Sequence, residues 1–214
     1  MEKTRGVATM GTTVLHWEWR TFGAEFGAAD ATFAAMEPDL AQESDEIYLL
    51  SPGTNAGVKI RAGRMEIKQL ERVDEAGLEQ WWLAMSEPFP LPLSEADRVC
   101  AALGVTALHL GKGTYSPAEL LAALAAPEQG LRAVMVHKLR RHYTVNGCRS
   151  EVAEVVAGGE TRRTLAIEAT DAAKVVARLH ELGLSGRENI SYPRWLKAIV
   201  GMEGEKEDGT HGQE

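Results

Sequence analysis

The stretch VLHWEWRTFG, residues Val14 to Gly23, alternates ionisable and bulky apolar side chains. Successive side chains of a β-strand point to opposite faces. A strand here would therefore carry two different faces, with His16, Glu18 and Arg20 on one and Leu15, Trp17 and Trp19 on the other. In an ordinary half-buried strand the polar face meets water, and this segment taken alone allows that interpretation.

The same kind of charged face recurs along the chain. Candidate strands present Lys59 with Arg61, Glu66 with Lys68, and Lys138 with Arg140 and His142, while Glu154 and Glu168 lie among apolar neighbours. Together with the first strand this makes six basic against four acidic groups, on a chain of net charge -8. A closed barrel with a ligand-sized lumen would place such groups inside and the tryptophan face outside, beneath helices.

Turn and capping signals divide the chain into strands and helices. Hairpin turns are predicted at Ala62-Gly63 and at Asn146-Gly147. Helices are predicted after a Ser94 cap, after Ser116 followed by proline, and after Asp171. About seven or eight hairpin-linked strands with helices at their ends predict an α+β fold with an antiparallel sheet. No glycine-rich phosphate loop of the dinucleotide or Walker type is present in the sequence.

Composition limits the class of protein. A chain of 214 residues, 44% hydrophobic, can form one core, and we expect a single domain over 13–201 with a helical insertion at about 106–130. Residues 1–12 and the acidic tail 202–214 are expected to be disordered. The net charge of -8 argues against nucleic-acid or anionic-membrane binding. Two distant cysteines and the absence of a signal-like segment favour a cytoplasmic protein.

Several short motifs occur in an order that resembles the CYTH superfamily of triphosphate tunnel metalloenzymes. They are EWR, VKIR, IKQL, HKLRRHY, EVV, AIE and SYPRWL, between about Val14 and Ile199. The resemblance implies a closed eight-stranded antiparallel β-barrel, or tunnel, that binds a small polyanion with Mg²⁺ or Mn²⁺. The polyanion would be a triphosphate, a polyphosphate or a nucleotide. Known members hydrolyse inorganic triphosphate or thiamine triphosphate, or cyclise ATP.

The resemblance also implies roles for individual residues. Phosphate binding falls to Arg20, Lys59, Arg61, Lys68, Lys138 and Arg140, metal binding to Glu18, Glu154 and Glu168 with His16 as a further candidate, and catalysis to Glu18, Arg61 and Arg140. Two acidic positions of the family pattern are absent, because His16 and Ala166 stand there. The phosphate-binding half is therefore complete and the metal-binding half is thinned.

Three functions remain open at this stage. The first is a divalent-metal-dependent phosphohydrolase that acts on inorganic triphosphate, polyphosphate or an organic triphosphate. The second is a noncatalytic sensor that binds polyphosphate or triphosphate. The third is an adenylate cyclase, for which no base-recognition motif is visible. Trp81 and Trp82 are expected to be packing aromatics of the barrel wall rather than a stacking platform. The SYPRWL motif is expected to dock a C-terminal helix over the barrel. The oligomeric state stays open.

Overall fold

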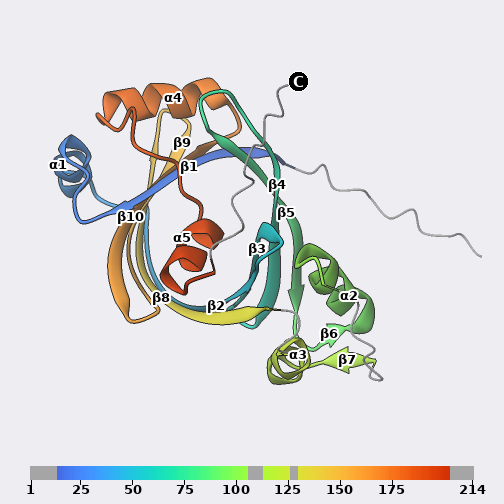
Figure 1. Ribbon diagram of the computed structural model, residues 1–214. Coiled ribbons are helices and arrows are strands. Elements are labelled where there is room, and N and C mark those ends of the chain that lie inside the picture. The colour runs from blue at the N-terminus through green and yellow to red at the C-terminus, as the bar shows by residue number, and fades with distance from the viewer. Residues whose placement is uncertain (1–13, 106–112, 126–129, 203–214) are drawn as a thin grey trace, which may run out of the picture.

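A closed barrel of antiparallel strands forms the centre of the computed structural model, which describes residues 14–105, 113–125 and 130–202 (Figure 1). The hydrogen-bonded order around the barrel is β1-β10-β9-β8-β2-β3-β4-β5, and β5 pairs again with β1. The strands span His16–Gly23 (β1), Leu40–Ser51 (β2), Thr54–Arg61 (β3), Arg64–Val73 (β4), Glu79–Pro88 (β5), Arg132–Val145 (β8), Cys148–Ala157 (β9) and Glu160–Ala169 (β10). The predicted α+β fold with a closed eight-stranded antiparallel barrel is confirmed.

The two predicted hairpin turns contain residues with positive φ, a backbone conformation that glycine adopts easily. Ala62 and Gly63 both have positive φ, as do Asn146 and Gly147, which is the geometry of the two-residue turns that match strand twist. These turns fix the register of the hairpins β3-β4 and β8-β9. The predictions for residues 1–12, for the tail from 203 and for parts of the 106–130 insertion fall outside the described residues.

Helices cover the apolar outer face of β1. Trp17 and Trp19 are buried in one core cluster with Phe33 of α1 (Ala28–Ala34) and with Val175 and Leu179 of α4 (Ala172–Glu181). Figure 1 shows α4 lying across the outside of the barrel. The alternation of the opening segment therefore has its tryptophans outward, beneath helices, and its ionisable residues inward.

A second cluster lies on the outside of β3 and β4. It is built by α2 (Leu93–Ala102), α3 (Pro117–Leu124) and the short pair β6 (Leu91–Pro92) and β7 (Thr114–Tyr115). The predicted Ser116 cap is present as a capping box with Glu119. The predicted Ser94 cap is wrong, because α2 already begins at Leu93, with Pro92 at the N-cap. None of the helices in the described ranges is long and apolar enough to span a membrane.

The last helix, α5 (Tyr192–Ile199), closes one end of the barrel (Figure 1). Tyr192, Trp195 and Leu196 pack into a third core cluster with side chains that face the barrel interior, among them Tyr48, Leu50, Val134, Val136, Ala153 and Val155. The SYPRWL motif thus supplies a stopper for one end of the lumen, with its tyrosine, tryptophan and leucine directed inward.

Candidate functional site

The barrel encloses a charged cavity of about 1140 Å³. Lys and Arg side chains and the carboxylates of Glu18, Glu66, Glu151 and Glu168 line it, together with His16 and His142. Ser191, Tyr192 and Pro193, at the start of α5, also belong to the lining. Because α5 closes that end, a ligand reaches the cavity from the opposite end of the barrel. The start of α5 is the floor of the cavity, and the opposite end is its mouth.

All six residues predicted to bind phosphate line this cavity: Arg20, Lys59, Arg61, Lys68, Lys138 and Arg140. Their exposure falls from mouth to floor. The side chain of Lys68 is 43% exposed and that of Arg61 32%, whereas those of Arg140 and Lys138 are 4% and 2% exposed. The positive charges are therefore distributed along the lumen, from half-exposed to buried side chains, and do not form one surface patch. We call these six side chains the phosphate column.

Glu18 lies between two of these cations. Its carboxylate accepts from Arg20 Nε at 3.2 Å and from Lys68 Nζ at 3.0 Å. Burial opposes its ionisation, but Lys68 and Arg20 outweigh burial and hold the pKa of Glu18 at about 2. Glu18 also raises the pKa of Lys68. The pair is fully charged at neutral pH, so a phosphate that binds Lys68 must share it with Glu18.

Glu46 of β2 is a residue that the sequence reasoning missed. It is fully buried beneath the cavity, within 3.1 Å of Lys59 Nζ, 3.0 Å of Lys138 Nζ and 3.1 Å of Arg140 Nη1. Despite the cost of burial, these cations lower the pKa of Glu46 far below its ordinary value. A signal was available in the sequence, since Glu46 is two residues from Tyr48 on the inward face of the strand.

The placement of Glu154 was predicted wrongly. Glu154 is exposed on the outer face of β9, opposite Leu139, and Glu151 points into the lumen instead. Glu151 accepts from Arg20 Nη1 at 2.9 Å. Burial raises its pKa, but Arg20 and Lys138 dominate and lower it to about 2. The correction follows from β9 itself, whose inward residues Ala153 and Val155 pack against the stopper helix.

The remaining predicted metal ligands, His16 and Glu168, do line the cavity. Glu18 and Glu168 are directly opposite each other in the β1-β10 register. Glu168 is 3.4 Å from Arg149 Nη1. Within the described residues no three His, Cys, Asp or Glu side chains gather closely enough to hold an ion. Two facing carboxylates still suit Mg²⁺, which commonly uses one or two and takes its other ligands from water and phosphate. The donors therefore fit a divalent ion that arrives with its phosphate.

Several buried polar atoms of residues that line the cavity have no partner within the described residues. They are Arg140 Nε, His142 Nδ1, Ser191 Oγ and Tyr192 Oη, and all four residues line the cavity. A buried donor without a partner costs about 1–3 kcal/mol, so such groups in a native fold usually serve water, an ion or a ligand. Unpartnered polar groups that line a cavity rich in Lys and Arg favour a bound oxyanion.

The loop before α5 forms hydrogen bonds with the part of β1 that carries Glu18 and Arg20. Pairing of β1 with β5 ends at Glu18. Beyond that point Asn189 Oδ1 accepts from Arg20 N at 2.8 Å, Asn189 Nδ2 donates to the Gly77 carbonyl at 2.8 Å, and Ile190 N donates to the Arg20 carbonyl. Asn189 thus bridges the seam where the two strands separate, and the backbone beneath Glu18 and Arg20 is fixed.

Comparison with known proteins gives resemblance only at the level of structure. No protein-family model and no curated protein matches the chain. Similar solved structures include a conserved hypothetical protein from Pyrococcus furiosus (17% identity, TM-score 0.47, 82% of this chain and 94% of that one). Another is HpAC1 from Hippeastrum, which has a dominant triphosphatase activity (12% identity, TM-score 0.46, 87% of this chain and 96% of that one). A third is the PH1819 protein from Pyrococcus horikoshii (14% identity, TM-score 0.40, 87% of this chain and 97% of that one).

The class of protein follows from the chain's own geometry. It is an α+β protein whose eight-stranded barrel closes around a charged lumen and is stoppered by a helix. This is the tunnel fold implied by the sequence motifs.

Proposed function

We propose that the chain binds a linear triphosphate or polyphosphate in the barrel lumen and hydrolyses its terminal phosphoanhydride bond with the help of a divalent metal. The observation that carries the proposal is the set of unpartnered buried polar groups in the cavity lining, together with the Lys and Arg side chains that line the same cavity. Phosphate oxygens match both features, because they accept several hydrogen bonds and carry the opposite charge. The triphosphatase activity of HpAC1, a structure of similar fold, agrees with this choice of substrate.

The chain's own groups would act mainly by positioning and charge neutralisation, which dominate phosphoryl transfer. Arg20 and Arg140 would hold the terminal phosphate near the floor, and Arg61 and Lys68 the phosphates nearer the mouth. Lys138 and Lys59 contribute positive charge, although Glu46 already binds both. A water oxygen forms the new bond to the terminal phosphorus, the bridging oxygen leaves with its electron pair, and the proton passes to solvent.

Glu18 and Glu168 would hold a Mg²⁺ or Mn²⁺ ion, with His16 of the same cavity as a further candidate ligand, and the ion would neutralise charge developing on the phosphate oxygens. Glu18 would in addition orient the water. Because each of these carboxylates pairs with Lys or Arg in the free protein, substrate and ion must displace those pairs together. Binding of the ion in the absence of phosphate is therefore expected to be weak.

A noncatalytic sensor is the alternative function. It is favoured by the pairing of the inward carboxylates with cations and by the absence, among the described residues, of a three-ligand metal group. Both functions use the same phosphate column, so they predict the same binding and differ only in turnover.

Phosphate release distinguishes the two functions. We expect purified protein to release phosphate slowly from inorganic triphosphate with Mg²⁺ and faster with Mn²⁺, because imidazole suits softer ions and His16 lines the same cavity as the carboxylates. The assay covers inorganic triphosphate, longer polyphosphate and ATP, each with Mg²⁺, Mn²⁺ or a chelator. Binding without release from any substrate would leave the sensor as the function.

A further inference from the structure

The middle of the outer face of β8 lies outside the three core clusters. Helices α1 and α4 cover the outer side of β1 and β10, and α2 and α3 cover that of β3 and β4. Between these covered regions Met135, Leu139 and Val156 are 61%, 45% and 39% exposed, and none of them belongs to a cluster. We call Met135, Leu139 and Val156 the outer apolar triad.

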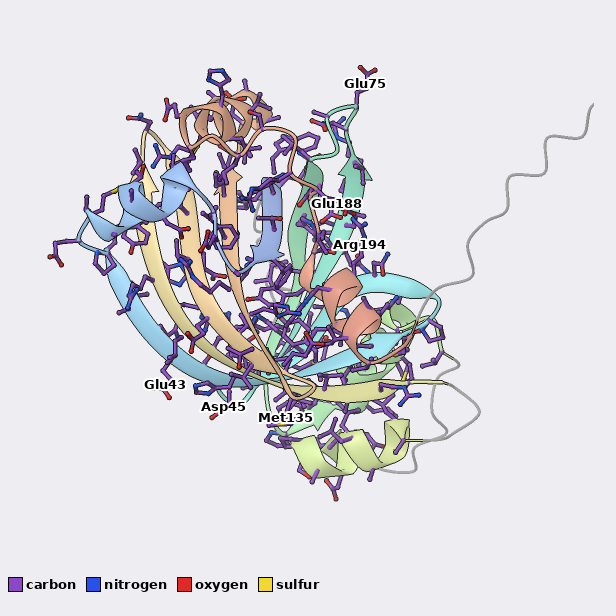
Figure 2. All side chains as sticks on the ribbon, turned by 60° about the vertical axis from the view of Figure 1, so that its left-hand side comes forward. Glu43, Asp45, Glu75, Met135, Glu188 and Arg194 are labelled. Atoms are coloured by element: carbon purple, nitrogen blue, oxygen red, sulfur yellow. The ribbon has the colours of Figure 1, made fainter. Side chains whose placement is uncertain are left out.

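Strand register brings the triad together in one patch. Met135 and Leu139 are four residues apart on β8, so they point to the same face at a spacing of about 13 Å. Val156 of β9 is the register partner of His137, which lies midway between them. Figure 2 shows Met135 on the outside of the barrel. The three apolar side chains therefore surround His137 on one outer surface.

Carboxylates border this patch. Leu139 has Glu43 of β2 as its register partner on one side and Glu154 of β9 on the other. Asp45 Oδ1 lies 2.9 Å from His137 Nδ1, and Glu43 Oε1 lies 3.5 Å from His137 Nε2. The side chains of Glu43 and Asp45 are nevertheless 69% and 75% exposed. An exposed apolar patch thus has an acidic border.

Fewer basic groups lie on the same face. Arg141 follows on β8 and is exposed, whereas Arg163 of β10 is already ion-paired with Asp30 at 2.6 Å. Two copies packed face to face through this patch would bring carboxylates together without enough cations to match them, which disfavours a second copy. A partner with Lys or Arg beside its apolar side chains is complementary in charge.

The closed barrel limits how such a partner can bind. Along this stretch β8 is paired with β2 on one side and with β9 on the other, so its backbone cannot accept an added strand. Contacts must therefore come from side chains. An amphipathic helix carries apolar side chains at i, i+4 and i+8. Eight residues of helix rise about 12 Å, which matches the spacing of Met135 and Leu139.

We propose that the outer apolar triad and its acidic border are a docking surface for a basic amphipathic helix of another protein. The apolar side of the helix covers Met135, Leu139 and Val156. Its Lys or Arg side chains pair with Glu43 and Glu154, which flank Leu139. The surface lies outside the lumen, so the helix binds without displacing a ligand from the phosphate column, and the inference is independent of the proposed function.

A synthetic helical peptide of leucine and lysine tests the surface, and a second peptide with glutamate in place of lysine keeps the same apolar side. Fluorescence anisotropy measures their binding to the wild type and to two pairs of variants. Leu139→Ser has Val176→Ser as its control, because Val176 of α4 is 46% exposed and Leu139 is 45% exposed. Glu154→Gln has Glu75→Gln as its control, because Figure 2 shows Glu75 at the end of the barrel remote from Met135.

We expect the lysine peptide to bind the wild type and to bind Leu139→Ser about fivefold more weakly, since part of one leucine contact is lost. Glu154→Gln should weaken binding about twofold, as is usual for an exposed ion pair. Val176→Ser and Glu75→Gln should change nothing, and the glutamate peptide should show no binding that depends on Leu139. Thermal unfolding verifies that all four variants are folded.

Three results would overturn the docking surface. They are no binding of the lysine peptide, equal effects of Leu139→Ser and Val176→Ser, and binding of the glutamate peptide that Leu139→Ser weakens as much. Sedimentation velocity supplies a fourth. A wild-type dimer that Leu139→Ser converts to a monomer would show that a second copy of the chain occupies the patch instead.

Discussion

Replacement of Glu46 by Gln should lower the free energy of unfolding by about 3–5 kcal/mol, because it leaves several buried cations without their shared counter-ion. Lys59, Lys138 and Arg140 all contact this carboxylate, and Lys138 is almost completely buried. In a domain of this size the loss corresponds to a fall in melting temperature of roughly 10 °C. Thermal unfolding in the absence of phosphate measures it.

Glu154→Gln is the matched control for Glu46→Gln, because Glu154 is an exposed carboxylate on the outer wall. It should change stability by less than about 0.5 kcal/mol. Adding Lys138→Met to Glu46→Gln should recover part of the loss, since the stranded charge is then removed as well. A single Glu46→Gln variant as stable as the wild type would contradict the assignment of Glu46 as the counter-ion of the floor.

The stability supplied by Glu46 should also depend on pH in a defined direction. The pKa of this carboxyl is lowered in the folded state relative to its ordinary value of 4.5, so protonation favours the unfolded chain. Its contribution is complete above pH 4.5 and is lost as the pH falls towards the folded-state pKa. The acid side of the stability profile should therefore be shallower in Glu46→Gln than in the wild type.

Glu18→Gln should separate chemistry from binding. Loss of the carboxylate removes the group that we propose to hold the metal and to orient water, so phosphate release should fall by about 10²-fold or more. The same change frees Arg20 and Lys68 from their shared partner, so triphosphate should bind at least as tightly as before. The two readouts are the rate of phosphate release and the dissociation constant measured without metal.

The control for Glu18→Gln is again Glu154→Gln, which should leave the rate and the affinity unchanged. A Glu18→Gln protein that turns over within threefold of the wild type would show that the catalytic carboxylate lies elsewhere in the lumen. Glu151 would then be the first candidate, because it shares Arg20 with Glu18.

The barrel and most of its lining could be predicted from sequence because strand alternation is a local property. The faces of β1, β3, β4 and β8 were each read from two or three alternate charged residues, and all of those residues line the cavity. Hairpin turns at Ala62-Gly63 and Asn146-Gly147 fixed the neighbouring registers. Closure of the sheet was implied by family resemblance and by the unusual recurrence of charged faces.

The errors arose where the barrel interior changes character along a strand. In β9 the inward face is charged at Glu151 and apolar from Ala153 onward, because α5 occupies that end of the lumen. Alternation alone therefore placed Glu154 inside. In β2 the run Glu43, Ser44, Asp45, Glu46 obscures the alternation, and pairing with β3 and β8 shows which carboxylate faces inward. Figure 2 shows Glu43 and Asp45 on the outside of the barrel, on the same side as Met135.

Contacts from the loop before α5 could not be predicted either. Asn189 reaches β1 across 169 residues of sequence, and no local pattern marks it as a bridge between Arg20 and Gly77. Glu188 lies in the same loop and Arg194 in α5, Figure 2 shows the two close together, and their side chains are ion-paired at 2.9 Å. Such hydrogen bonds join residues that are far apart in sequence and come together only in the closed barrel. They can therefore be predicted only once the fold is known.

Binding of inorganic triphosphate to two adjacent arginine variants tests the central claim, that the lumen is the phosphate site, most directly. Arg140 lines the lumen and Arg141, the next residue on β8, is exposed outside it. The side-chain charge removed is identical in Arg140→Gln and Arg141→Gln, so any difference reports position alone. With folding of both verified by thermal unfolding, calorimetry should show at least tenfold weaker binding for Arg140→Gln and wild-type affinity for Arg141→Gln. Equal affinities for the two variants would contradict a phosphate site inside the barrel.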